Sequence, residues 1–503
     1  MNTISMHRIR QIAAAAAVLS VMLPESGWGQ AASIDRLFRT QDDNYFHTPL
    51  GLCEDYPEES TTPEIIEGDL DLLNETGVDL LRISFGWDGI EGEKDQYDWL
   101  FWDDFVESAV DEHGVTLIPY ICYTPLWNST TDDINNSWHY PPKDYEEFGE
   151  FVYDLVSRYK DRIKTWEIWN EPDIWIFWAG NQEEFARLLK TGSDAVRRAD
   201  PEAKVVMGGL AHDTEWLESL FRDHGVSPYV DVVNIHNYFE TWVAKPLEDV
   251  AGYVNEVARI VDAHGDAQAI WMAEVGYSTF RDSSFVSDGY SAYYEYEHTP
   301  EYQAVDLIRR VTTALSTQKL SALAWYEIKD LQSGEETIGD FGNNGNLGVV
   351  GPDYTPKPAQ QALKFFNGLM ASPSRTLPAT IETEEARRDL PIDLPATIAT
   401  DTAANLTPVV HAFEQADGDV VIVGWLPTFD PNRSESPGAG MHKDERSQTV
   451  KVNLPLAVAE SGLLYNELGE SQPFDAIDTE GSRSTIEVTL KGGGVTVLEM
   501  KKP

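Results

Sequence analysis

Two glutamates, each placed where a short apolar run of the sequence ends, have the residue type and position for catalysis. Glu171 lies in the stretch WEIWNEPD at residues 166–173, and Glu274 lies in IWMAEVGYS at residues 270–278. Both runs are typical of buried β-strands, so each carboxyl group would emerge at a strand end. Such a pair suits cleavage of a glycosidic bond with retention, because one carboxyl acts as acid and then as base while the other attacks the sugar carbon.

The elements that must hold these glutamates alternate between strand and helix. Continuous apolar runs predict strands at residues 46–53, 78–85, 115–122, 166–173, 205–208, 230–237, 269–274 and 322–326. Helical spacing of apolar residues, with start and stop signals such as Pro63 and Gly77, predicts helices at residues 62–76, 100–113, 144–159, 183–198, 214–223, 247–263, 300–317 and 358–366. Eight consecutive β-then-α units predict an α/β fold, a (β/α)8 TIM barrel, whose parallel strands are covered on both faces.

The pattern changes beyond this predicted barrel. Residues 371–407 are rich in Pro, Thr and acidic side chains, which is typical of a connecting stretch. After it come β-like runs separated by turn residues, at 409–413, 420–425, 448–454, 486–490 and 495–500. These short strands predict a C-terminal β-sandwich. The predicted organisation is therefore a leader at 1–31, a barrel at 32–370, the connecting stretch, and a sandwich at 408–503.

The N-terminal residues resemble a secretory signal peptide. His7, Arg8 and Arg10 form a positive start, and residues 12–23 form an apolar run that is too short to span a bilayer comfortably. Gly29-Gln30-Ala31 offers a cleavage site with small residues. Since no other long apolar run follows, we expect a secreted or periplasmic protein without a membrane span.

The charge of the chain is strongly negative. Its 503 residues include 85 Asp and Glu against 37 Lys and Arg, for a net charge of -48. A nucleic-acid partner is excluded, because binding phosphates needs positive charge. The acidic residues are spread along the chain, which favours a halophilic protein whose self-repulsion is screened by salt. An acidic secreted protein without salt adaptation is the alternative.

The two cysteines are expected to stay unpaired. Cys53 and Cys122 fall at the ends of predicted strands one and three, and two strand spacings amount to roughly 9–10 Å. A disulfide needs Cα atoms within roughly 7 Å, so a bridge would require the loops to bend together. No Cys/His spacing indicates a metal site either. The sequence therefore gives no reason to expect a metal ion or a cofactor.

The motifs around the two glutamates resemble those of clan A of the glycoside hydrolases. The Trp-Asn-Glu-Pro sequence after one strand and a Glu closing a later one are typical of that clan. The resemblance implies a retaining O-glycosyl hydrolase with Glu171 as acid/base and Glu274 as nucleophile. The stretches WEIWNEP and FGWDGIEGEKDQYDW, at residues 85–99, are most similar to family 39. Family 5 is the next closest, but the His that it carries near the end of strand three is missing from IPYICYTPLW, at residues 118–127.

The same resemblance implies roles for further residues at strand ends. Arg82 would keep the nucleophile ionised, as a neighbouring cation does, and Tyr238 would orient it. Asn170 would contact the sugar 2-hydroxyl. His236 matches the His-x-Tyr pattern of the clan, although a lone His is more often structural. Trp325 matches the clan's sugar-platform tryptophan. All five are predicted to act in substrate binding or in support of it.

Other candidates come from the chain's own composition. Tyr123 and Trp127, in the stretch where family 5 has its histidine, are predicted to contact sugar. Glu167 competes with Glu171 because it lies on the same strand face. Its deeper position instead predicts a buried, paired carboxylate. Aromatic side chains also gather in the expected loops, where two or three could line sugar subsites: Trp87, Trp127, Trp138, Trp175, Phe177 and Trp178.

The sequence therefore predicts a secreted retaining glycosidase acting on an oligo- or polysaccharide. A catalytically silent carbohydrate-binding protein on the same scaffold is the main alternative, although it leaves the two glutamates without a role. A structural or adhesion protein led by the sandwich explains neither glutamate. Exo and endo action are not distinguished, because the loops that would open or close a cleft carry no clear signal.

Overall fold

The computed structural model describes most of the chain. The described residues are 34–38, 44–58, 60–239, 246–280, 298–332, 337–338, 341–383, 407–427 and 445–503. The predicted leader at residues 1–31 lies outside them. No helix within these ranges is long and apolar enough to cross a membrane.

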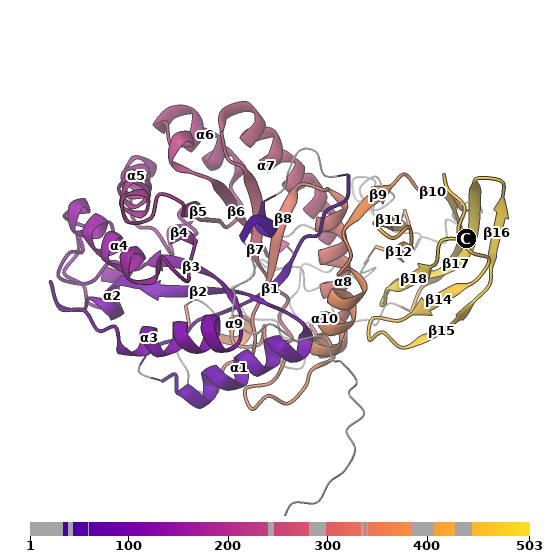
Figure 1. Ribbon diagram of the computed structural model, residues 1–503, viewed down its shortest axis with the longest axis horizontal. Helices are drawn as coiled ribbons and strands as arrows, with labels where there is room; N and C mark the ends of the chain where they lie inside the picture. Colours follow the sequence, from indigo (N-terminus) through magenta and orange to yellow (C-terminus); the bar gives the residue numbers. More distant parts are fainter. Residues whose placement is uncertain are drawn as a thin grey trace, which may run out of the picture.

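The first part of the chain forms a closed parallel barrel, as predicted, with eight strands in sequential order (Figure 1). The strands are β1 Leu50–Glu54, β2 Leu80–Gly86, β3 Thr116–Cys122, β4 Thr165–Asn170, β5 Lys204–Leu210, β6 Val232–Asn237, β7 Ala269–Val275 and β8 Leu320–Tyr326. The ring closes because β1 also pairs with β8, with Cys53 opposite Tyr326. This register later fixes which residues meet at the mouth of the barrel.

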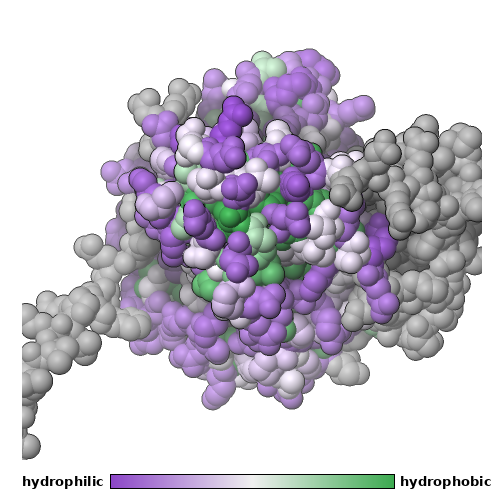
Figure 2. All heavy atoms as spheres, turned by 90° about the vertical axis from the view of Figure 1, so that its right-hand side faces the viewer, coloured by the Kyte–Doolittle hydropathy of each residue, from purple (hydrophilic) through white to green (hydrophobic). Residues whose placement is uncertain are grey.

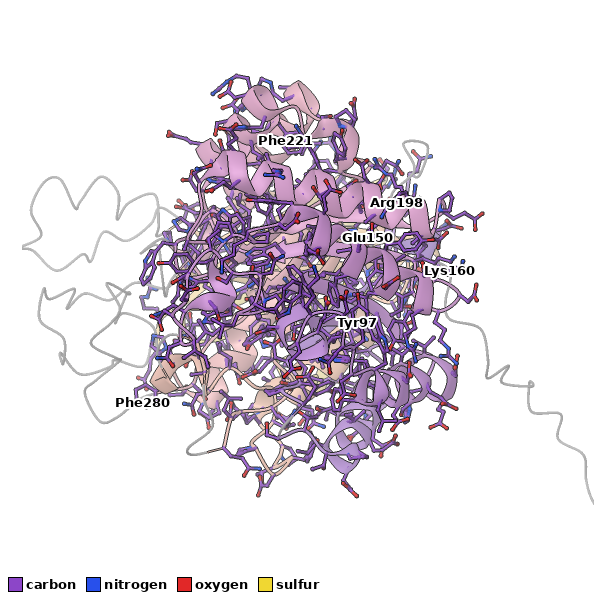
Figure 3. All side chains as sticks on the ribbon, turned by 90° about the vertical axis from the view of Figure 1, so that its left-hand side faces the viewer. Tyr97, Glu150, Lys160, Arg198, Phe221 and Phe280 are labelled. Carbon is purple, nitrogen blue, oxygen red and sulfur yellow. The ribbon has the colours of Figure 1, made fainter. Side chains whose placement is uncertain are left out.

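Helices cover the outside of the barrel. They are α1 Pro63–Thr76, α2 Trp87–Ile90, α3 Leu100–Val106, α4 Tyr145–Tyr159, α5 Gln182–Ala199, α6 Thr214–His224, α7 Val250–His264, α8 Pro300–Ser316, α9 Phe341–Asn344 and α10 Pro358–Leu369. Figure 3 shows this layer, where Arg198 of α5 lies beside Glu150 of α4 at 3.3 Å between Nη2 and Oε1. The helix predicted at 100–113 differs, because α3 passes into a π-helix at Glu107–Glu112.

Both faces of the barrel strands are buried, which explains their continuous apolar sequences. Alternate residues point outward to the helices or inward to the barrel axis. The inward set includes small and large side chains such as Ala273, Ala324 and Trp271. A 3-10 helix, Ile34–Leu37, meets them, with the Trp271 indole donating to the Leu37 carbonyl at 2.9 Å. The interior is a packed core, so the site must lie at its mouth.

The C-terminal part forms two antiparallel sheets, as the predicted β-sandwich requires. One has the order β10-β13-β17-β16 and the other β15-β14-β18-β12-β11-β9. Their strands are β9 Ser374–Leu377, β10 Thr380–Glu382, β11 Val409–Gln415, β12 Val420–Trp425, β13 Ser447–Leu454, β14 Gly462–Tyr465, β15 Ser471–Phe474, β16 Ile477–Glu480, β17 Arg483–Lys491 and β18 Thr496–Met500. Apolar side chains from both sheets form a shared core, among them Ile422, Val452, Val488 and Leu498.

The stretch predicted as a connection at 371–407 contains structure. Strands β9 and β10 lie in it and pair with β11 and β13, respectively. They were missed because they are short, half-exposed and mostly polar, as are β15 and β16, whereas β14 is apolar but only four residues long. Such strands lack the apolar run on which the prediction depended.

Side-chain contacts join the sandwich to the barrel. The indole of Trp425 on β12 donates to Glu248 at 2.9 Å, just before α7. The guanidinium of Arg309 on α8 donates to the Gly494 carbonyl at 2.5 Å and also to that of Gly492. Viewed from the sandwich side, the surface is mostly hydrophilic, with hydrophobic residues near the centre (Figure 2).

Candidate active site

Glu171 directly follows β4, where the backbone departs from regular strand geometry. Trp169 and Glu171 both have positive φ, at 75° and 40°. Residues with a Cβ rarely adopt this left-handed region, so the turn stores strain that the surrounding structure must hold. The Glu171 amide donates to the Gly209 carbonyl at 2.9 Å and fixes the turn against β5. The carboxyl group is thereby presented at the carboxyl end of the strand.

Asp173 fixes the loop that follows. Its carboxylate accepts hydrogen bonds from the backbone amides of Ala211, His212 and Asp213 at 2.8–3.0 Å. The β4–α5 loop is therefore tied to the β5–α6 loop two residues after Glu171. Such supports hold a carboxyl group in one orientation, which acid–base chemistry requires.

Glu274 lies near the end of β7 and is held by two donors. Nη1 of Arg82 donates to its Oε2 at 2.8 Å, and the hydroxyl of Tyr238 donates to its Oε1 at 3.0 Å. Arg82 comes from β2 and Tyr238 follows β6, so two further strand ends converge on this carboxylate. The predicted support of Glu274 by both residues agrees with this geometry.

Glu167 is buried and paired, as predicted. Its Oε2 accepts from Nε of Arg82 at 2.9 Å, and its Oε1 accepts from the Gly209 amide at 2.7 Å and from Nδ2 of Asn234 at 3.0 Å. The side chain is fully buried within the barrel. Because Arg82 is shared between Glu167 and Glu274, the deeper carboxylate orients the guanidinium under the site.

Asn170 contacts the same cation. Its Oδ1 accepts from Nη2 of Arg82 at 2.8 Å, and the residue is only 5 % exposed. This contact directs the other end of the amide, Nδ2, away from Arg82. A hydrogen-bond donor is what the predicted contact to a sugar hydroxyl requires.

His236 lies between the two candidate catalytic glutamates. Its Nδ1 is 2.8 Å from Oε1 of Glu171 and 3.5 Å from Oε2 of Glu274. Burial, and then the charge of Arg82, hold the pKa of His236 well below its ordinary value, so the ring is neutral. The ring has no exposed surface. His236 therefore contacts both carboxyl groups and supports them, which agrees with the supporting role predicted as one alternative.

Gly209 is the residue that makes room for this histidine. A Cβ atom at Gly209 would lie 1.9 Å from Nε2 of His236. Atoms this close overlap, so only glycine permits the ring to rest on β5. The sequence prediction did not include Gly209, because a contact between neighbouring strands leaves no local pattern.

The two candidate carboxyl groups are close together. An oxygen of Glu171 and an oxygen of Glu274 lie within 4.8 Å of each other. Retaining glycosidases keep their carboxyl groups about 5–5.5 Å apart, whereas inverting ones leave about 6.5–9.5 Å for a water molecule. The spacing therefore fits retention.

The surroundings of the pair separate their proton affinities. Burial raises the pKa of Glu171 well above its ordinary value, and the charge of Glu274 raises it further. Burial also raises the pKa of Glu274, but Arg82 and the Tyr238 hydroxyl lower it. A single proton shared by the pair therefore resides on Glu171, which suits Glu171 as the acid and Glu274 as the ionised partner.

Comparison with known proteins places this site in a family. The model of glycosyl hydrolases family 39 matches residues 92–372, more than half of the chain, and this match includes both glutamates. The chain belongs to glycosyl hydrolases family 39. This family lies in clan A of the glycoside hydrolases, and the predicted resemblance to family 39 rather than family 5 is confirmed.

Individual relatives are distant. The chain is 25% identical over 247 residues to a β-xylosidase of Caldicellulosiruptor saccharolyticus, a match that covers 46% of this chain and 47% of the relative. It is 29% identical over 146 residues to a β-xylosidase of Geobacillus stearothermophilus, covering 25% of this chain and 28% of that protein. The chain thus spans half or less of the length of the curated relatives it matches.

Solved structures share the whole architecture. A monomeric β-xylosidase from Caulobacter crescentus superposes with a TM-score of 0.61 at 16% identity, covering 91% of this chain and 96% of that one. A family 39 enzyme from Xanthomonas axonopodis pv. citri has a TM-score of 0.61 at 15% identity, covering 96% of this chain and 100% of that one. At these identities the likeness shows the fold: a barrel followed by a sandwich.

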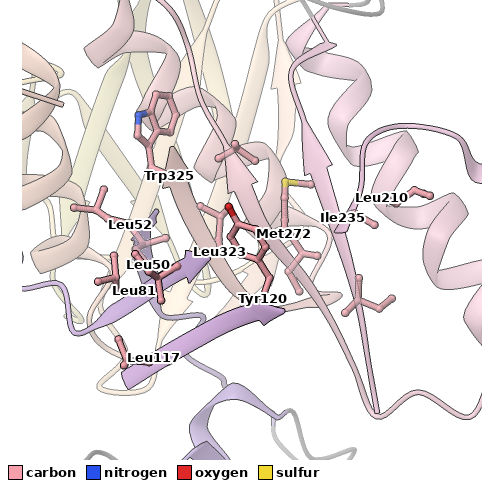
Figure 4. Close-up of a cluster of buried hydrophobic side chains, with 14 of the residues drawn as sticks. Leu50, Leu52, Leu81, Leu117, Tyr120, Leu210, Ile235, Met272, Leu323 and Trp325 are labelled. Atoms are coloured by element: carbon pink, nitrogen blue, oxygen red, sulfur yellow. The ribbon is translucent and has the colours of Figure 1, made fainter. Parts of the chain in front are cut away.

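One aromatic prediction for this family 39 barrel is wrong. Trp325 on β8 is 1 % exposed and belongs to the cluster of buried hydrophobic side chains drawn in Figure 4, together with Leu52 of β1. Ala324 and Tyr326, on either side of it, face the barrel interior. Strand alternation therefore turns Trp325 towards the helices, and Tyr326 is the β8 aromatic residue that reaches the mouth.

Tyr123 and Trp127 occupy different surroundings. Tyr123 is half-buried, 6.0 Å from the Trp169 ring and 5.0 Å from the Trp138 ring, beside the turn that carries Glu171. Trp127 instead donates from Nε1 to the Glu91 carbonyl at 2.8 Å. This hydrogen bond connects Trp127 to the segment between β2 and α3, which contains Glu91. A sugar contact for either residue stays a prediction.

The other loop aromatics divide by exposure. Trp87 and Trp178 are buried and cannot form a sugar platform in this conformation. Trp138 and Phe177 are half-buried and pack edge to face at 6.1 Å. Trp175 is 76 % exposed. These three, together with the half-buried Trp127, are the predicted loop aromatics that remain available to a ligand.

Both cysteines are free and buried, which confirms the prediction of two free thiols. Sγ of Cys53 is 3.1 Å from the Ala273 carbonyl. Burial raises the pKa of both thiols, so neither is a reactive thiolate at neutral pH.

Proposed function

We propose that the protein hydrolyses O-glycosidic bonds of an oligo- or polysaccharide by a double displacement in which Glu274 attacks the sugar and Glu171 is the acid/base. The observation that carries the proposal is the approach of the two carboxyl groups to within 4.8 Å. Inverting pairs typically stand about 6.5–9.5 Å apart to leave room for a water molecule, so this approach supports a retaining mechanism.

The first step uses the proton on Glu171. That proton passes to the glycosidic oxygen, so the aglycone leaves as a neutral alcohol. At the same time a Glu274 oxygen bonds to the anomeric carbon, and a glycosyl ester forms. Arg82 and Tyr238 support this step because they stabilise the ionised form of Glu274 before the attack.

The second step reverses these roles. Glu171, now a carboxylate, takes a proton from a water molecule that attacks the anomeric carbon, and Glu274 leaves. His236 contacts Glu171 in both steps and, being neutral, adds no charge to the site. Two inversions at the same carbon give retention overall.

The substrate to test first is a β-xyloside. This choice is supported by the β-xylosidases among the relatives. The alternative of a silent carbohydrate-binding protein does not account for two carboxyl groups brought together in surroundings that affect their pKa values differently. A folded wild-type protein that cleaves no member of a panel of aryl glycosides and polysaccharides would favour that alternative.

Azide rescue tests the two roles separately. On an activated aryl glycoside, Glu171→Ala should still form the intermediate, and added azide should release a glycosyl azide of retained configuration. Glu274→Ala should be inactive until azide replaces the missing nucleophile and gives an inverted product. Glu480→Ala, on exposed β16 of the sandwich, is the matched control and should behave as wild type. Opposite stereochemistry in the two variants would reverse the assignment.

Export is a second part of the proposal. Its support is the predicted leader with Gly29-Gln30-Ala31 at the cleavage point. Mass spectrometry of the protein recovered from outside the cytoplasm should find a chain starting after Ala31. An intact N-terminus on that protein would contradict cleavage at this site.

A further inference from the structure

Asp55, one residue beyond β1, lies at the mouth of the barrel. Cys53 faces the interior and pairs with Tyr326 across the β1–β8 seam, so Asp55 continues the inward face above it. Its Oδ1 accepts from the Tyr120 hydroxyl at 2.5 Å, and its Oδ2 accepts from the Tyr326 hydroxyl at 3.4 Å. Both carboxylate oxygens are thus oriented by side chains of two other barrel strands.

A chain of contacts connects Asp55 to the proposed nucleophile. The guanidinium carbon of Arg82 lies 4.2 Å from the centre of the Tyr120 ring, and Arg82 donates to Glu274 at 2.8 Å. Moreover, the charge of Asp55 contributes to raising the pKa of Glu274. Asp55 is therefore close enough to act on whatever occupies the space above Glu274.

Asp55 is a carboxylate without a cation. It forms no ion pair with any residue of the described ranges, and it is only half-buried. A carboxylate has about four lone-pair positions, and two phenol hydroxyls fill two of them. Acceptor capacity thus remains at the mouth of the barrel, where hydroxyl donors of a sugar would arrive.

The charges around the site are unbalanced. Arg82 is the one cation among the described side chains that contact Glu274, and it already serves Glu167 as well. With the proton on Glu171, the group of Arg82, Glu167, Glu274 and Asp55 carries more negative than positive charge. A ligand with its own carboxylate would meet repulsion there, whereas a neutral polyol would meet acceptors.

We propose that Asp55 is a specificity-determining residue. Its carboxylate accepts hydrogen bonds from hydroxyl groups of the sugar ring next to the cleaved bond, and its negative charge excludes sugar rings that carry a carboxylate. The enzyme then acts on glycosides of neutral sugars and rejects those of uronic acids. This inference rests on the proposed function, and it adds the substrate class. The competing role for Asp55 is purely structural, to hold the Tyr120 and Tyr326 hydroxyl groups in place. That role predicts that the activity does not depend on the charge of the substrate.

The test uses Asp55→Asn, which keeps the shape of the side chain and removes its charge. The wild type should cleave a 4-nitrophenyl β-xyloside and show little activity on the β-glucuronide. The variant should lose about 10–100-fold in kcat/KM on the xyloside, because a hydrogen bond to a charged acceptor is weakened. Asp478→Asn, an equal charge change on exposed β16, should leave it unchanged.

Inhibition experiments measure whether the site rejects negatively charged sugars. Glucose and glucuronate differ at the group attached to carbon 5, and each is tested as an inhibitor of xyloside hydrolysis. Glucuronate should inhibit the wild type at least about 10-fold more weakly than glucose, and this ratio should shrink by about the same factor in Asp55→Asn. The unfolding midpoint of the variant checks that both proteins are folded.

Several outcomes would overturn the proposal. A loss of less than threefold in kcat/KM of Asp55→Asn on the xyloside would show that Asp55 does not bind a sugar hydroxyl group. Two results would show that Asp55 does not exclude charged sugars and only holds the two tyrosines in place. The first is cleavage of the glucuronide by the wild type at a rate similar to that of the xyloside. The second is a ratio of glucose inhibition to glucuronate inhibition that Asp55→Asn leaves unchanged. Should the variant fail to fold, equal inhibition of the wild type by the two sugars would still refute the inference. A folded wild type that cleaves no glycoside would instead refute the proposed function itself.

Discussion

Replacing Gly209 with alanine tests the geometry of the site at one point. The new Cβ would lie 1.9 Å from Nε2 of His236 and 2.6 Å from its Cδ2 and Cε1, whereas ordinary contacts begin at 3.4 Å. The difference, 3.4 − 1.9, means that the ring must retreat by 1.5 Å. The ring has no exposed surface, so it cannot turn out into solvent without displacing its neighbours. The movement must therefore disturb the 2.8 Å contact between His236 and Glu171.

The expected size of the effect has two parts. Overpacking a filled core costs about 1–3 kcal/mol of unfolding free energy, and the lost hydrogen bond adds about 1 kcal/mol. For activity, a displacement of about 1 Å at a catalytic group can cost about 100-fold. Because His236 contacts the acid, substrates with poor leaving groups should lose more in kcat/KM than those with good ones.

The assay compares kcat/KM on a series of aryl glycosides with the thermal unfolding midpoint. Gly252→Ala is the matched control, since a Cβ at that position of α7 meets nothing within 4 Å and should stabilise the helix slightly, by about 0.5–1 kcal/mol. Activity of Gly209→Ala within threefold of wild type, at an unchanged midpoint, would refute the close packing of His236 on β5.

Three further predictions concern the nucleophile, the loops and the surface. Tyr238→Phe removes a hydrogen bond that lowers the pKa of Glu274, so the acidic limb of the kcat/KM profile should move to higher pH; a limb that stays in place would contradict this support. Trp175→Ala should lower kcat/KM on long oligosaccharides and leave aryl glycosides and stability nearly unchanged, because the side chain is 76 % exposed; equal losses on both substrates would argue against a platform. The net charge of the chain is -48, so the midpoint of thermal unfolding should rise from low to molar NaCl, because the Debye length falls from about 30 to about 3 Å and repulsion is screened. A midpoint that stays flat or falls, or an equal rise only with sulfate, would contradict salt adaptation.

The barrel could be predicted because its strands are uninterrupted apolar runs. Residues such as Leu81, Ile121 and Val233 are buried on one strand face while their neighbours fill the other. The two catalytic candidates followed from the same pattern, since Glu171 and Glu274 are polar residues at the ends of such runs. The order and spacing of the apolar runs along the chain were sufficient there.

Side-chain direction was less predictable. Trp325 and Tyr326 are adjacent aromatic residues at the end of β8, and only the strand register decides which one faces the axis. Contacts between strands gave no signal at all, as with Gly209 and His236. Asp55 was missed for a different reason: in a chain with 85 acidic residues, one more carboxylate after a strand is not distinctive.

The central claim is that Glu274 forms a covalent bond with the sugar. A 2-deoxy-2-fluoro xyloside with a good leaving group slows both steps, but the first less than the second, so the intermediate accumulates. Mass spectrometry of the intact protein should then show one added fluoroxylosyl group, and peptide mapping should place it on Glu274. A label on any other residue, or no label together with an inverted first product by NMR, would contradict the account.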